Sequence, residues 1–443
     1  MKNLLERSIG LCDCNNFFVS CERRENPSLL SRPVVVLSGN DGCVVSRSNE
    51  AKALGVGMGE PYFKVRGLLE RAGAAVLSGR LSLYNKISSE VMGRLSRFSD
   101  LMEVYSIDEA FFNLAIASVE DPAAYCREIR EDIWRSCGIP VSIGISSTKT
   151  LAKLASHCAK MSADGVFWID SSCAGDAEWM AAFPLEEVWG IGRRMAARLR
   201  SSYRIKNTAD FMMADDLWLK KNFSVNALYT AWELRGYSVY PLSEKHGAPS
   251  SIQVSRSFGD AVSSYEELLD AVSYFTLCAA RQLRGARQAA SRMGLYIRTN
   301  PFRRENFYFG EDEYIFSVPK SLDADFLYAA RSMLQKIFRE GALYKKAGVR
   351  LSGFSDVSFG RQRLLFDEDG EPEGERNGRL RAAAAVADAL NLEFGKVVIA
   401  SADNFAAPER TPRWYPQRAH SAAAEEARRR PPLPLGPKRR VSF

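Results

Sequence analysis

Histidine is scarce in this sequence of 443 residues, where only His157, His246 and His420 occur. Imidazole-based catalysis therefore has few possible positions, and serine–histidine hydrolase chemistry is disfavoured. The nine cysteines are an odd number without repeated spacing, so they do not suggest a disulfide framework. Cys12-x-Cys14 and His157-Cys158 do not supply the two spaced ligand pairs of a structural zinc site.

Long apolar runs are also absent. No stretch approaches the ~18 uninterrupted apolar residues of a membrane span, which excludes a transmembrane protein. Glu6 stands where a signal peptide would have its apolar core, so we expect a cytoplasmic protein without membrane association. Hydrophobic residues make up 46% and charged residues 26%, a globular balance, and the length predicts two to four domains.

Positive charge is concentrated rather than spread. The formal net charge is +7, but residues 408–443 alone hold nine Arg or Lys against three Glu. Residues 281–304 hold seven arginines and no acid. This block is either a footprint for a polyanion or a solvated helix face, and its composition alone leaves both open.

Residues 1–175 alternate strand and helix patterns. Short apolar runs predict strands at 8–12, 33–38, 43–46, 101–105, 110–114 and 141–146. Asp121-Pro122 predicts the start of a helix that ends at Gly138. A second helix follows near 149–158, with Lys149, Lys153 and Lys160 expected on its more exposed side. The pattern indicates an α/β or α+β domain.

The remaining chain changes character twice. Short helical patterns fill 176–245 and predict an all-α domain; two helices and four strands are predicted within 246–355. A helix near 379–394 and a strand near 396–400 are expected in the segment 356–407, and the Pro- and Arg-rich tail 408–443 is expected to be disordered. The fold class is therefore α+β multidomain.

Three carboxylates stand out by position. Asp13 ends the first predicted strand, and Asp108-Glu109 lies at the junction of the strands 101–105 and 110–114. Acids at such strand ends are costly unless a cation offsets their repulsion, and Mg²⁺ prefers oxygen ligands. Two such ions can activate an attacking oxygen and stabilise a leaving one. Spacing alone is weak evidence for such a site, because Asp-Glu dipeptides are common and surface acids in a turn are the more frequent explanation.

The sequence around these acids resembles the acidic motifs of the Y-family (translesion) DNA polymerases, and more specifically the UmuC type, the catalytic subunit of bacterial DNA polymerase V. The resemblance runs in order from about residue 8 to residue 400. Its motifs are LCDCNNFF at 11–18, NDGCVV at 40–45, EAKALGV at 50–56, YSIDEAF at 105–111, TKTLAKLA at 148–155, VWGIGRR at 188–194 and SRSFG at 255–259.

The resemblance implies an error-prone polymerase that performs template-directed nucleotidyl transfer at damaged DNA in the SOS response. It implies a right-hand fold with a ferredoxin-like palm and small fingers (about 32–85) within 1–175. A helix-hairpin-helix thumb would follow at 176–245, a little finger at 246–355, and a segment with a clamp-binding motif at 356–407.

The same resemblance implies site residues. Two Mg²⁺ ions would be held by Asp13, Asp108, Glu109 and the backbone carbonyl of Cys14. The incoming deoxynucleoside triphosphate would contact a further set: Phe17, Phe18 as the steric gate against ribose, Lys52, Lys160 and Asn49. Asn49 stands where many family members have a tyrosine, which puts that contact in doubt.

Contacts with larger partners are implied as well. Primer–template DNA would be bound by Gly190, Gly192, Arg193, Arg194, Arg256, Arg281, Arg284 and Arg287. A sliding clamp would take Gln362, Leu365 and Phe366, and a UmuD′-type dimer and a RecA filament are further expected partners.

Two other functions use the same features. A two-metal nuclease or nucleotidyl cyclase could use the same carboxylates, and a non-catalytic subunit could bind clamp and DNA alone. The glycine hairpin at 190–192 and the arginine block 281–304 favour primer–template DNA over a lone nucleotide. Extension of a primer separates the three.

Overall fold

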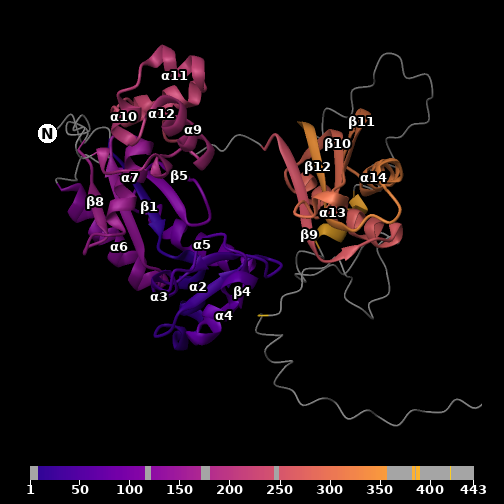
Figure 1. Ribbon diagram of the computed structural model, residues 1–443, viewed down its shortest axis with the longest axis horizontal. Helices are drawn as coiled ribbons and strands as arrows, with labels where there is room; N and C mark the ends of the chain where they lie inside the picture. Colours follow the sequence, from indigo (N-terminus) through magenta and orange to yellow (C-terminus); the bar gives the residue numbers. More distant parts are fainter. Residues whose placement is uncertain are drawn as a thin grey trace, which may run out of the picture. The chain divides into compact units, whose positions relative to one another are not determined.

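The computed structural model describes residues 8–114, 121–170, 180–243, 249–356, 382–384, 386–389 and 420. The chain divides into two compact units, Met1–His246 with His420–Phe443, and Gly247–Ala419. The strands of the described residues form two sheets in the first unit and one in the second (Figure 1). The strand expected near 396–400 lies outside these residues, as does the tail 408–443 apart from His420.

A five-stranded sheet in the order β5-β6-β1-β7-β8 forms the centre of the first unit. Its neighbours are antiparallel except for β7 and β8, which are parallel. The central strand is buried along its whole length because helices cover both faces of the sheet. The strands are β1 (Ile9–Cys14), β5 (Met102–Val104), β6 (Glu109–Asn113), β7 (Val141–Ser146) and β8 (Val166–Trp168).

Helices α5 (Leu81–Leu95) and α6 (Pro122–Cys137) lie on one face of this sheet, and α7 (Lys149–Ala159) lies on the other. The prediction for α6 is confirmed, because the Asp121 side chain caps its first turn and Gly138 ends it in the left-handed conformation. Gly144 allows the close approach of α7, since a Cβ there would lie 2.1 Å from a backbone nitrogen of that helix.

A smaller sheet in the order β3-β2-β4 forms a separate part of the first unit. The predicted strands at 33–38 and 43–46 are confirmed: β2 (Val34–Leu37) and β3 (Val44–Arg47) pair antiparallel across a turn with Asp41 at φ 54°. The parallel neighbour of β2 is β4 (Ala75–Ser78), whose last N–H donates to the carbonyl of His420. The helices beside this sheet are α2 (Phe17–Glu25), α3 (Asn49–Ala53) and α4 (Tyr62–Arg71), and a 3₁₀ turn spans Pro27–Leu29.

The predicted all-α region is confirmed by four short helices, which share an apolar core with one face of α7. They are α9 (Arg193–Tyr203), α10 (Thr208–Met212), α11 (Asp216–Asn222) and α12 (Val225–Leu234), after a 3₁₀ turn at Leu185–Glu187. The expectation that Lys149 is exposed is wrong. Its ammonium group is buried between Glu103 and the carbonyl of Pro241, because the chain that follows α12 covers this side of α7.

The second unit contains a four-stranded antiparallel sheet in the order β11-β10-β12-β9, with two helices packed on one face (Figure 1). The prediction of two helices and four strands is confirmed. The elements are β9 (Ser251–Val262), α13 (Tyr265–Gly285), β10 (Gln288–Thr299), a 3₁₀ turn at Arg304–Asn306, β11 (Phe309–Lys320), α14 (Asp323–Ile337) and β12 (Tyr344–Asp356). None of the helices described above has both the length and the apolarity of a bilayer span.

Candidate active site

The three predicted carboxylates come together at one end of the five-stranded sheet. Asp13 on β1 is the direct cross-strand partner of Glu109 on β6. Directly opposed residues of antiparallel strands place their side chains on the same face, which here is the face toward α7. Asp108 is adjacent, since its carbonyl accepts from the N–H of Cys14 at 2.8 Å and its carboxylate accepts from the Ser106 hydroxyl at 2.5 Å.

Two lysines of the α7 region neutralise these acids. The ammonium group of Lys160 lies 2.7 Å from the Asp13 carboxylate, and that of Lys153 lies 3.1 Å from the Glu109 carboxylate. Lys153 also lies over the ring of Tyr105, 4.5 Å from its centroid. Burial raises the pKa of Asp13 to about 6, against the opposing attraction of Lys160 and with help from the neighbouring acids.

The donor chemistry of this cluster fits a divalent cation, because carboxylate oxygens are the ligands that hard cations prefer. In the arrangement of the described residues, no three Asp, Glu, His or Cys side chains surround one point where an ion would sit. The contacts with Lys160 and Lys153 explain this, since each turns a carboxylate toward an ammonium group. A metal ion would have to replace those lysines.

A basic group lies beside Asp13. Burial, together with repulsion from Arg47 and Lys160, lowers the pKa of Lys52, and Asp13 opposes this shift. Lys52 on α3 therefore lies near three charged groups of the site. Asn49, one turn before it, accepts hydrogen bonds from the Asn16 amide at 3.1 Å and from Lys52 at 3.4 Å.

The predicted gate Phe18 and its neighbour Phe17 begin α2, which two residues separate from the end of β1. Phe17 is buried in the core beneath the sheet. Phe18 is only partly buried, and one face of its ring stacks on Tyr84 at 4.4 Å between centroids with an interplanar angle of 15°. A partly exposed ring beside the carboxylate strand is suitably placed to contact a substrate.

The predicted DNA-binding hairpin adjoins the carboxylates through an aromatic contact. Gly190 has φ 89°, which favours glycine, and Gly192 immediately precedes α9. Arg193 and Arg194 are exposed on its first turn. Trp189, just before the hairpin, donates from its indole nitrogen to the Tyr105 hydroxyl at 3.0 Å.

The arginines predicted to bind DNA in the second unit differ in their surroundings. Arg256 and Arg287 are exposed. Arg284 is mostly buried and pairs with Asp323 at 2.6 Å and with Asp388 at 2.7 Å, and Arg281 lies 3.3 Å from Asp388. Intramolecular pairs therefore engage these two guanidinium groups. The predicted clamp residues Gln362, Leu365 and Phe366 lie outside the described residues.

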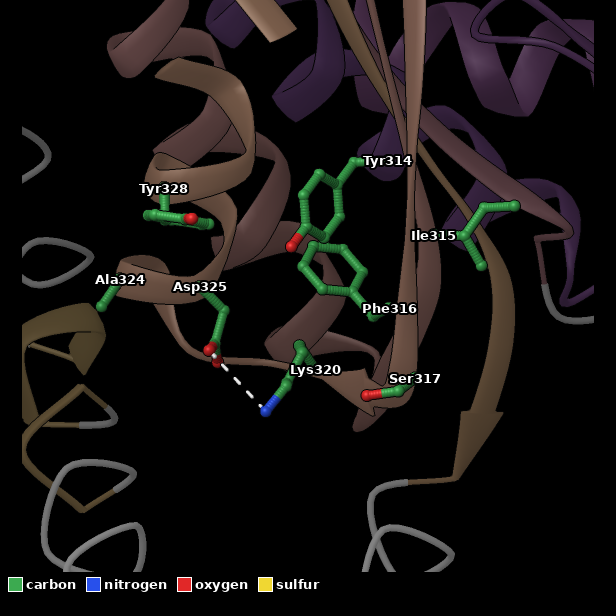
Figure 2. A pocket seen from close by; sticks show the side chains of 8 residues that line it. All are labelled: Tyr314, Ile315, Phe316, Ser317, Lys320, Ala324, Asp325 and Tyr328. Carbon is green, nitrogen blue, oxygen red and sulfur yellow. Dashed lines mark ion pairs between the residues drawn. The ribbon is translucent and has the colours of Figure 1, made fainter. Parts of the chain in front are cut away.

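A hollow of about 490 Å³ lies on the second unit, between the edge strand β11 and α14 (Figure 2). Figure 2 shows the rings of Tyr314 and Phe316 on one side and Tyr328 on the other, with an ion pair of 3.8 Å between Lys320 and Asp325 at the rim. None of the predicted site residues lines it.

Comparison with known proteins identifies the family. Residues 12–157 match the impB/mucB/samB family, and residues 249–364 match the C-terminal domain of that family. Protein UmuC of Salmonella typhimurium is 38% identical over 392 residues, which are 87% of this chain and 91% of that protein.

This chain belongs to the impB/mucB/samB family.

Other relatives agree. Protein MucB of Escherichia coli is 35% identical over 86% of this chain and 90% of its own length, and DNA polymerase IV of Moorella thermoacetica is 28% identical over 88% and 94%. A Y-family DNA polymerase chimera built on Dbh superposes with a TM-score of 0.65 at 21% identity, covering 79% of this chain and 99% of the chimera. The predicted right-hand polymerase fold and the UmuC-type assignment are confirmed.

The family membership makes this chain a Y-family, error-prone translesion DNA polymerase that acts on DNA and nucleotides. Polymerases of this family use divalent metal ions, and the first matched segment, 12–157, contains the three carboxylates of the site.

Three residues near this site, Lys153, Arg47 and Tyr84, were not predicted from the sequence. Lys153 lies seven residues, or two helical turns, before the predicted site residue Lys160. Because this spacing places both lysines on one face of the helix, the sequence could have predicted that Lys153 also lies near the site. Arg47 and Tyr84 had no such signal, because a β-strand arginine and a core tyrosine come near Lys52 and Phe18 only through the fold.

Proposed function

We propose that this chain extends primers across damaged templates by nucleotidyl transfer at Asp13, Asp108 and Glu109. The cross-strand pairing of Asp13 with Glu109, beside Asp108, carries this proposal within a polymerase family. These side chains and the Cys14 carbonyl would hold two Mg²⁺ ions. Bound Mg²⁺ supplies charge neutralisation at the phosphates and a more nucleophilic primer 3′-oxygen.

In this proposal, the basic residues Lys160, Lys52 and Arg47 bind the triphosphate of the incoming nucleotide. Lys160 is 44% exposed at its side chain, so its ammonium group can leave Asp13 for a phosphate oxygen without unfolding α7. Lys52 adds positive charge near Asp13, and Arg47 adds positive charge near Lys52. Phosphate contacts from such fixed cations position the α-phosphate for attack. Phe18 excludes a 2′-hydroxyl by occupying the space beside the sugar.

In this proposal, four parts of the chain have separate roles, and two of them bind the DNA backbone. The five-stranded sheet is the palm, the residues at about 32–85 are the fingers, and the thumb spans 176–245. Gly190, Gly192, Arg193 and Arg194 contact the DNA backbone from the thumb. The little finger at 246–355 adds Arg256 and Arg287, whose exposed charges suit phosphate contacts. Such contacts are indifferent to base sequence, as a polymerase requires.

The partners and setting complete the proposal. Gln362, Leu365 and Phe366 dock into a bacterial sliding clamp, and a UmuD′-type dimer and a RecA filament join the enzyme in the cytoplasm during the SOS response. Two observations support these partners. The first is the resemblance to the UmuC type. The second is the Gln-x-x-Leu-Phe pattern at 362–366, which lies at the end of the segment 249–364 that matches the family's C-terminal domain.

Primer extension by the Asp108→Ala variant tests the catalytic assignment. We expect extension past an abasic template site to fall by about 10³-fold, because a lost metal-ligand carboxylate removes several kcal/mol of transition-state stabilisation. Binding of primer–template DNA should stay within about twofold. The full chain is assayed with Mg²⁺, alone and with clamp, UmuD′-type and RecA proteins.

Asp100→Ala is the matched control, because Asp100 is an exposed acid just before β5 that pairs with Asn113. It should extend normally. Undiminished extension by Asp108→Ala would rule out the metal assignment. Shortening of the primer would favour a nuclease, and DNA binding without extension under every condition would favour a non-catalytic subunit.

A further inference from the structure

The ring that faces the nucleotide sugar is supported by a second aromatic residue. Phe18 and Glu22 lie one turn apart on α2, and Arg80 and Tyr84 lie one turn apart at the start of α5. The two helices therefore bring two side chains of α2 into contact with two side chains at the start of α5. Its first contact is the stack of Phe18 on Tyr84, with ring centroids 4.4 Å apart.

Polar contacts fix the supporting ring. Tyr84 is fully buried, and its hydroxyl donates to the Glu22 carboxylate at 2.7 Å. The guanidinium group of Arg80 donates to both oxygens of the same carboxylate, at 2.9 Å from Nε and in a shorter contact from Nη2. Hydrogen bonds to a charged group are stronger than those between neutral groups, so Tyr84 is held more firmly than packing alone would hold it.

The gate has no comparable anchor of its own. A phenylalanine ring carries no hydrogen-bonding group, so only its neighbours hold it in place. Exclusion of a 2′-hydroxyl fails if the ring can retreat by the size of one oxygen atom. Stacked aromatic rings attract each other beyond the contribution of burial, and the Tyr84 ring covers one face of the Phe18 ring.

We propose that Tyr84 is a positioning residue for sugar selection, which holds Phe18 against the nucleotide sugar while Glu22 and Arg80 hold Tyr84. This inference rests on the proposed role of Phe18 as the gate, and adds a residue that does not itself touch the nucleotide.

The test compares discrimination between deoxyribonucleotides and ribonucleotides in single-nucleotide insertion by the full chain, in the assembly that extends primers. The measured quantity is the ratio of kcat/KM for the two sugars. Tyr84→Leu should lower this ratio about five- to tenfold, because the stack is lost. Tyr84→Phe keeps the ring but loses the hydroxyl, and should lower it two- to threefold.

Two further variants separate the gate from its support. Phe18→Ala should lower the ratio most, and adding Tyr84→Leu to Phe18→Ala should lower it no further, because Tyr84 acts only through Phe18. Tyr125→Leu is the control, since Tyr125 packs on Phe98 with a hydroxyl bond to the Phe98 carbonyl. It should leave the ratio unchanged.

The outcomes are distinguishable. An unchanged ratio in Tyr84→Leu, with a lowered ratio in Phe18→Ala, overturns the positioning role and keeps the gate. An unchanged ratio in Phe18→Ala overturns the gate itself. If Tyr84→Leu does not fold, Tyr84→Phe decides, and wild-type discrimination in that variant overturns the inference.

Discussion

At the scale of single residues, the site is an arrangement of opposed charges. Asp13 has a side chain only 10% exposed, so most of its hydration is lost on folding, and Lys160 at 2.7 Å compensates. Each predicted metal ligand on the face toward α7 has a lysine of this kind. On the proposed assignment of the site, catalysis therefore depends on a metal ion replacing these lysines, and we expect the basic residues beside Asp13 to contribute to nucleotide affinity.

Lys52→Ala tests that dependence. We expect KM for the incoming nucleotide to rise about tenfold, because one charge-assisted contact to phosphate contributes about 1.4 kcal/mol or more. The rate at saturating nucleotide should change less than threefold. Steady-state single-nucleotide insertion measures both constants.

Lys64→Ala, an exposed lysine on α4, provides the comparison and should behave as the wild type. Equal KM values for Lys52→Ala and the wild type would contradict the assignment of Lys52 to the triphosphate.

At the scale of elements, α7 connects the sheet to the helical part of the same unit. Its first turn carries Lys149, whose buried ammonium group lies 2.6 Å from Glu103 on β5 and donates to the Pro241 carbonyl at 2.9 Å. The same helix shares a core with the helices that follow. Lys149 therefore ties together strand, helix and the chain beyond α12.

Lys149→Met should destabilise the first unit strongly. Removing one partner of a buried pair costs about 3–5 kcal/mol, and the remaining Ser243 N–H bond to Glu103 places the expected loss near 3 kcal/mol. A unit of this size should then unfold about 6–12 °C lower in a calorimetric scan.

The double variant Lys149→Met/Glu103→Gln should recover part of that loss, since no unpaired charge remains buried. A melting temperature of Lys149→Met equal to that of the wild type would show that this pair is not a structural tie.

Helix capping accounts for only some of the predictions, because α9 and α14 were predicted without a side-chain cap, and α3, which Ser48 caps, was not predicted. Helices α6, α7 and α13 begin after Asp121, Thr148 and Ser264, whose side chains accept from first-turn N–H groups, and all three were predicted. The helices α2, α4 and α5 were missed, and none of them begins with a side-chain cap. The sequence around each of these starts therefore carries no side-chain capping signal.

The contacts around the candidate site also divide into those that the sequence predicts and those that it does not. Asp13, Asp108 and Glu109 were predictable because strand ends and motifs identify them locally. The burial of Lys149 was not, because the segment that covers it comes from Pro241 and Ser243, about 90 residues later in the chain. The pairing of Arg284 with Asp388 has the same cause.

At the scale of the whole molecule, we expect DNA affinity to depend on local clusters of positive charge more than on the net charge of the chain. The net charge is +7, but 408–443 contributes nine basic and three acidic residues, so the rest is near neutral. Duplex affinity must then come from local clusters such as the exposed arginines at the start of α9.

The salt dependence of DNA binding tests this view. Arg193→Gln and Arg194→Gln should each reduce the slope of log K against log salt by about 0.9, one phosphate contact per residue, whatever the base sequence. Fluorescence anisotropy with a labelled primer–template at several salt concentrations gives the slope.

Arg200→Gln is the companion variant on the same helix, and its guanidinium group already pairs with Glu186. It should leave the slope unchanged. If the slopes for Arg193→Gln and Arg194→Gln equal the wild-type slope, these arginines do not contact DNA phosphates and the proposed role of the hairpin in DNA binding is wrong.

The pairing of acids with lysines also bears on the order in which substrates arrive. Three carboxylates stand beside Lys153, Lys160 and Lys52, so the resting site holds its own counter-ions and has no formal surplus of negative charge. A polyanion approaching from solution is then not repelled, even before any metal is in place. On the proposed assignment of the site, nucleotide and metal would enter as one complex, and the ammonium group of Lys160 would then leave Asp13 and contact the phosphates.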